Sequence, residues 1–138
     1  MAIDSLPHVL SMVHCLTGLG EVHGPRAVMK SPEHMQIVFG YRHGGGDLKV
    51  EVDLIRSPNS PRPGGYAING RSVKRSVILP EYQIVFTDDS GHQIALEDPL
   101  KKRVRQYLAD VESKKSTSRE QLIASMKNLM DVVENIHL

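Results

Sequence analysis

The sequence predicts an α+β fold with an N-terminal helix, an antiparallel meander of five to six strands, and two C-terminal helices packed on the sheet. Apolar residues recur at helical spacing near both ends of the chain, and between about 26 and 97 they alternate with polar residues. Turn sequences rich in glycine, asparagine and aspartate separate the alternating runs. Because 138 residues suit one domain, a single α+β domain over 1–138 is expected.

The first helix is expected from about Ser5 to Leu19. Asp4 or Ser5 can cap its start, and Gly18 and Gly20 favour its end, because glycine accepts the left-handed conformation found just beyond helices. Its apolar stripe consists of Leu6, Val9, Leu10, Val13 and Leu16.

The alternating region begins most clearly with two runs, 35–41 and 48–54, joined by the glycine-rich segment 43–47. Asn69-Gly70 is a strong turn signal, and 87–91 has a turn composition. Further strands are expected at 26–30, at 66–73, which 77–79 continues or restarts, and at 82–86 and 92–96.

Two helices follow the strands. Asp98-Pro99 is a strong start signal, because a capping side chain precedes a proline in the first helical position. A polar break at 114–118 ends this helix, and Thr117 or Ser118 with Glu120 or Gln121 fits a capping box for the next one. The buried stripe expected on the first of these helices consists of Leu100, Val104, Tyr107, Leu108 and Val111.

The composition places the chain among globular proteins. Hydrophobic residues make up 40% and charged residues 24%, which argues against global disorder. There is no apolar run of the roughly 18 residues that a membrane helix needs, so no membrane partner is expected. A lone cysteine, Cys15, and a start without the features of a secretory signal favour a cytoplasmic location.

Positive charge is unevenly distributed although the net charge is only +1. No acidic residue occurs in the segment 54–80, and a second basic cluster opens the helix after Asp98, where the helix dipole disfavours cations. If they meet in space, these clusters would bind nucleic acid or another polyanion. The alternative is a set of separate solvated faces. The residues are Arg56, Arg62, Arg71, Lys74, Arg75, Lys101, Lys102, Arg103 and Arg105.

The last helix carries a long apolar face in which methionine is central. Methionine adapts to irregular partners, so this face suits a homodimer or another protein partner, and the alternative is that it packs in the chain's own core. The residues predicted to bind a partner are Leu122, Met126, Leu129, Met130 and Val133.

Catalytic and metal-binding patterns are weak. Glu51 and Asp53 share one face of a strand, but Lys49 lies there too, and the set fits a polar strand face. The seven histidines lack the i, i+4 spacing of a zinc pair, and the glycines at 44–46 lack the context of a phosphate-binding loop. No catalytic residue, metal ligand or cofactor is therefore predicted.

Three hypotheses follow for the function. The leading one is a non-enzymatic protein-binding domain of the adaptor, chaperone-like or inhibitor type, which self-associates through its C-terminal helices. The alternative is a nucleic-acid or polyanion-binding protein that uses the acid-free segment 54–80 and the cluster 101–105. A small hydrolase or metal-dependent enzyme is the third.

Overall fold

A computed structural model describes residues 2–113 and 119–136 of the chain. The chain divides into two compact units, Met1–Arg56 with Thr117–Leu138 (the first unit) and Ser57–Ser116 (the second unit). The α+β class, the N-terminal helix and the two C-terminal helices are confirmed. The expectation of a single domain over 1–138 stays a prediction.

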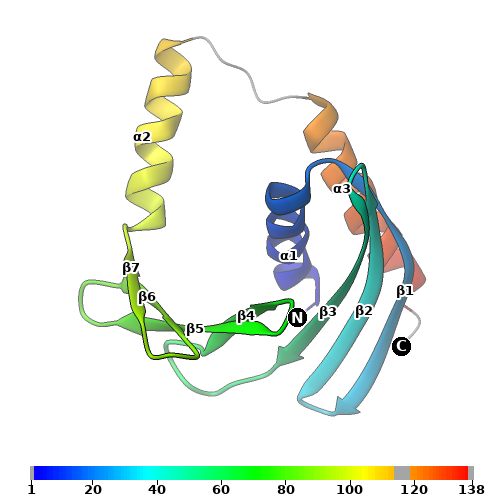
Figure 1. Cartoon of the computed structure of the whole chain (residues 1–138), viewed down its shortest axis with the longest axis horizontal. Helices are drawn as coiled ribbons and strands as arrows, with labels where there is room; N and C mark the ends of the chain where they lie inside the picture. Colours follow the sequence, from blue (N-terminus) through cyan, green and yellow to red (C-terminus); the bar gives the residue numbers. More distant parts are fainter. Residues whose placement is uncertain (1, 114–118, 137–138) are drawn as a thin grey trace. The chain divides into compact units, whose positions relative to one another are not determined.

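The strand count differs from the predicted meander of five to six strands. The described residues form seven strands, arranged as one antiparallel sheet of three and a second of four (Figure 1). The loop between the sheets contains Pro58, Pro61 and Pro63. Proline lacks the N–H that a sheet ladder needs, so pairing does not continue through this loop.

The first unit combines a three-stranded sheet with two helices. The strands pair in the order β1-β2-β3, and Val22 of β1 lies opposite Tyr41 of β2. α3 lies against β1 and α1, which gives the sheet a helical layer. The elements are α1 (Ala2–Thr17), β1 (Gly20–Ser31), β2 (His34–His43), β3 (Gly46–Ile55) and α3 (Arg119–Asn135).

Alternation along β2 builds the core of this unit. Every second side chain from Met35 to Tyr41 is buried, because successive residues of a strand point to opposite faces of the sheet. Leu6 and Leu10 of α1 and Val132 of α3 pack in the same cluster. Tyr41 is almost fully buried, and its hydroxyl donates a hydrogen bond to the Gly18 carbonyl at 3.0 Å.

Asn128 of α3 is the one buried polar residue in the part of the chain whose burial is described. Its Oδ1 accepts a hydrogen bond from the Val22 N–H at 3.1 Å, and its Nδ2 donates to the Gly20 carbonyl at 2.9 Å. Both partners are backbone groups of β1. The amide thereby ties α3 to the edge of the sheet and satisfies its own polar atoms inside the core.

The second unit is a four-stranded antiparallel sheet in the order β4-β5-β6-β7, followed by one helix. Asn69 and Gly70 both have positive φ, of 51° and 80°, as the tight hairpin turn predicted from this pair requires. The elements are β4 (Gly64–Ile68), β5 (Arg71–Ile78), β6 (Gln83–Asp88), β7 (Gln93–Leu96) and α2 (Pro99–Glu112).

The start of α2 matches the sequence prediction. Asp98 Oδ1 accepts a hydrogen bond from the Leu100 N–H at 2.8 Å, and Pro99 is the first helical residue. The capping box expected at Thr117 or Ser118 and the polar break at 114–118 lie outside the described residues. No helix in the described part of the chain is long and apolar enough to cross a membrane.

Candidate functional site

The apolar stripe of α2 is exposed rather than buried as the sequence suggested. Leu100 is 70% exposed, Tyr107 66% and Val104 50%, and Leu108 and Val111 lie between these values. An amphipathic helix ordinarily buries such a stripe against another layer of its domain. Apolar surfaces of this kind are seldom left exposed on monomeric soluble proteins.

The residues of this stripe have a regular spacing. Leu100, Val104, Tyr107 and Val111 are separated by four, three and four residues, which is the spacing of the core positions in two packed helices. Leu108 lies beside this seam. A shallow hollow of about 430 Å³ opens next to the first half of α2. It is lined by Glu97, Leu100, Lys101, Val104 and Arg105.

The sheet of the second unit also has an apolar face with little cover. Val85 is the one buried hydrophobic residue of this unit among those described, and it lies on the opposite face of the sheet. The rings of Tyr66 and Phe86 contact each other at 5.8 Å between centroids. The strand registers place eight apolar residues on this face, namely Tyr66, Ile68, Val73, Val77, Ile84, Phe86, Ile94 and Leu96.

The predicted partner-binding face of α3 divides into two rows. Leu129 and Val133 pack against the core of the first unit, beside the buried Val132. Leu122, Met126 and Met130 are 50–60% exposed. The second row follows i, i+4 spacing along one side of the helix, so the predicted face is exposed along one row and belongs to the core along the other.

The structure places the predicted polyanion-binding residues on different faces. Within β5, Arg71 and Arg75 share one face of the sheet and Lys74 lies on the other, because side chains alternate along a strand. Arg75 Nη2 donates to the Arg62 carbonyl at 3.1 Å, and Arg105 pairs with Glu97. Lys101, Lys102 and Arg103 are consecutive on α2 and therefore point in different directions. Polyanion binding stays a prediction.

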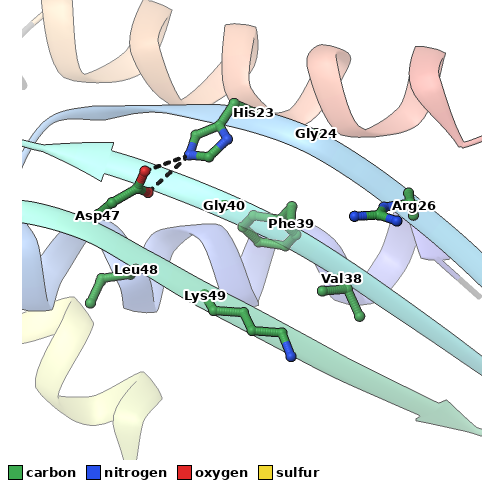
Figure 2. A pocket seen from close by; sticks show the side chains of 9 residues that line it. All are labelled: His23, Gly24, Arg26, Val38, Phe39, Gly40, Asp47, Leu48 and Lys49. Carbon is green, nitrogen blue, oxygen red and sulfur yellow. Dashed lines mark hydrogen bonds and ion pairs between the residues drawn. The ribbon is translucent and has the colours of Figure 1, made fainter.

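The outer face of the first sheet carries a histidine–aspartate pair that sequence spacing did not reveal. His23 Nε2 lies 2.9 Å from Asp47 Oδ1, although β2 separates their strands. The pairing register puts Gly40 of β2 opposite His23, and Figure 2 shows the imidazole lying across this glycine toward Asp47. Because Gly40 has no side chain, the ring can cross the middle strand.

An open, shallow pocket of about 440 Å³ surrounds this pair (Figure 2). Its lining also includes the cationic residues Arg26 and Lys49 and the apolar residue Val38. The hydrogen bond from His23 lowers the pKa of Asp47 below its usual value, which keeps the carboxylate charged. Both side chains are about half exposed, so the pair lacks the dry surroundings that strengthen catalytic dyads.

A second pair occupies the same sheet face about six residues further along β3. His34 Nε2 lies 2.7 Å from Asp53 Oδ1, and Lys30 Nζ approaches the same oxygen at 3.5 Å. The His34 hydrogen bond lowers the pKa of Asp53. Glu51 pairs instead with Lys49, so the two carboxylates considered in the sequence have separate cationic partners.

No group of three or more potential metal ligands comes together within the residues described. The apolar surface of the second unit was missed because its residues have the spacing expected of a core. Two features of α2 could have revealed this surface from the sequence: the heptad-like spacing of its apolar residues, and an order of charges with basic residues in the first half of the helix and acidic residues in the second. The His23–Asp47 pair had no local signal, because 24 residues separate its members.

Comparison with known proteins gives no match: no family model, no curated protein and no solved structure is significantly similar to this chain.

Proposed function

We propose that this chain is a non-enzymatic protein-binding domain that self-associates into a homodimer through its C-terminal helices. The observation that supports this function most directly is the exposed stripe of α2, in which five apolar side chains are half or more exposed. The exposed row of α3, formed by Leu122, Met126 and Met130, adds a second apolar surface.

The second unit gives a physical reason for a partner. Its sheet and its helix both have an apolar side, but Val85 is its one buried hydrophobic residue among those described. Burying apolar surface contributes about 25 cal/mol per Å², and a small unit has little else to offset its loss of chain entropy. A second copy that covers these side chains would supply the missing layer.

The alternative functions have less support in the structure. An enzyme would need acid–base or nucleophilic groups in a secluded site, and the His23–Asp47 pocket is open and half exposed. A polyanion surface would need the basic side chains on one face, and β5 divides them between two.

The test is the molar mass in solution, measured by light scattering over a dilution series. We expect a dimer at high concentration that dissociates on dilution. The paired substitutions Val104→Ser with Tyr107→Ser, and separately Met126→Ser with Met130→Ser, should shift the equilibrium toward monomer by at least about tenfold, because they remove central apolar contacts.

The matched control is Lys102→Ser with Ala109→Ser, which changes the side of α2 away from the stripe. Circular dichroism must show that all variants keep their helices. A chain that is monomeric at every concentration, or a dimer that none of the apolar substitutions weakens, would overturn the proposal.

A further inference from the structure

The charges of α2 are divided between its two halves. Lys101, Lys102, Arg103 and Arg105 occupy the first half of the helix, whereas Asp110 and Glu112 lie in the second. This order opposes the helix dipole, which favours carboxylates at the start of a helix and cations at its end. A neighbouring helix with the opposite charge order would offset this unfavourable arrangement. An antiparallel copy of α2 has that order.

We propose that α2 packs against α2 of a second copy of this chain in an antiparallel pair about a two-fold axis. This inference rests on the self-association proposed above and specifies its surface and orientation. In such a pair Leu100 packs beside Val111 of the second copy, and Val104 beside Tyr107 of the second copy. The spacing of four, three and four residues reads the same in both directions, so the reversed helix brings these positions into register. Each layer then pairs a valine with a larger side chain, leucine or tyrosine.

The residues beside the seam favour the antiparallel orientation. Arg103 and Asp110 lie on the same side of the seam, about two helical turns apart. In an antiparallel pair this side of one helix faces the same side of the other. Arg103 therefore lies opposite Asp110 of the second copy, and the two-fold axis generates this contact twice. Leu108 lies on the other side, which is the side of the hollow between Leu100 and Val104. It can therefore enter the hollow of the second copy, where Lys101 can cover it with its aliphatic stem.

A parallel pair would lose these contacts. Opposite sides of the seam then face each other, so Arg103 would lie against Leu108 of the second copy and the hollow would not receive that leucine. The two basic halves would also lie side by side, and like charges repel. The charge pattern and the hollow thus distinguish between the two orientations on independent grounds.

The predicted contact is small. Four layers over a helix of 14 residues bury less surface than a permanent dimer requires, so dissociation on dilution is expected. This size also makes the pair sensitive to single charge reversals, because two symmetric Arg103–Asp110 contacts are a large share of its polar interactions.

Disulfide trapping tests the orientation. Leu100→Cys and Val111→Cys are made separately in a Cys15→Ser background, since Cys15 is exposed, and the two proteins carry distinguishable tags. In the antiparallel pair the two Leu100 positions are about 16 Å apart along the axis, beyond the 7 Å limit for a disulfide. Each variant alone should therefore stay uncrosslinked under mild oxidation, and the mixture should form the mixed dimer.

Charge reversal gives a second readout that does not depend on cysteine. Arg103→Glu or Asp110→Lys alone should weaken the dimer by about threefold to tenfold, and the double variant should return to within about threefold of the original. Reversal of Lys102 on the outer side of the helix is the control and should change the dimer much less.

The outcomes separate the two proposals. Crosslinking of Leu100→Cys with itself would show a parallel pair, and a dimer with no crosslink in any combination would show that another surface joins the copies. Either result overturns this inference and leaves self-association intact. A monomer at every concentration overturns both.

Discussion

The imidazole of His23 lies over Gly40, the residue directly opposite it in the sheet, and reaches Asp47 on the far side of the middle strand. A Cβ at position 40 would overlap the His23 ring. Gly40 has negative φ, so a side chain here meets no backbone strain, and its effect depends on the histidine alone.

We therefore expect Gly40→Ala to destabilise the protein by no more than about 1 kcal/mol, because the half-exposed His23 ring can swing aside and loses only its surface contact with Asp47. The measurement is the free energy of unfolding from denaturant titration. In a His23→Ala background the same substitution should cost much less, since no ring remains to be displaced. An equal cost in both backgrounds would show that the ring is not what Gly40 accommodates.

The lowered pKa of Asp47 predicts a dependence of stability on acidity. A carboxyl whose pKa is lower in the folded chain contributes stability above its unfolded pKa of about 3.9, and this contribution is lost as the pH falls through the folded value. Asp47→Asn should therefore flatten the fall in melting temperature below about pH 4.

The largest cause of this shift is the hydrogen bond from His23. In a His23→Ala background, the effect of Asp47→Asn on the acid side should consequently shrink. Thermal unfolding of the four proteins between pH 3 and pH 6 measures both effects. An unchanged effect of Asp47→Asn in the two backgrounds would contradict the assignment to His23.

Asn128 should be the most costly polar side chain of α3 to remove. Its amide satisfies the Val22 N–H and the Gly20 carbonyl of β1, so Asn128→Ala leaves buried polar groups without partners, at a cost of about 2 kcal/mol or more. Asn135→Ala on the exposed part of the same helix is the control and should cost about 0.5 kcal/mol or less. Comparable losses of unfolding free energy in the two variants would count against the tie between α3 and β1.

The buried hydroxyl of Tyr41 predicts that the free energy of unfolding changes with pH in the alkaline range. Burial raises its pKa, so the folded chain holds the phenolic proton more tightly than the unfolded chain does. That contribution is fully present below pH 10 and is lost as the pH rises through the folded value. Tyr41→Phe should lower the unfolding free energy by about 1 kcal/mol at pH 7, because the hydrogen bond to the Gly18 carbonyl is lost. Above pH 10 the unfolding free energy of this variant should fall less steeply with pH than that of the original protein.

The control for this prediction is Tyr82→Phe, because Tyr82 is 70% exposed. Equilibrium unfolding at pH 7 and at pH 10.5 is the measurement. Identical behaviour of the two variants would contradict a role for the buried hydroxyl.

Local patterns in the sequence determined most of the elements. Alternation from Met35 to Tyr41 predicted β2, and Asp98-Pro99 predicted the start of α2, because strand pleat and helix capping depend on neighbouring residues. Asn69-Gly70 predicted its turn for the same reason. The predicted start of the first helix, Ser5, lies about three residues after the observed start at Ala2, because no sharp local signal marks that start.

The tertiary structure alone decided which apolar stripes are buried. α2 and α3 have similar apolar spacing, yet Val132 of α3 is fully buried and Tyr107 of α2 is 66% exposed. Spacing shows that a helix has an apolar side, but burial requires a second layer, which depends on distant segments. The His23–Asp47 pair has the same origin: strand register brought together two residues 24 positions apart, and Gly40 left room for the ring between them.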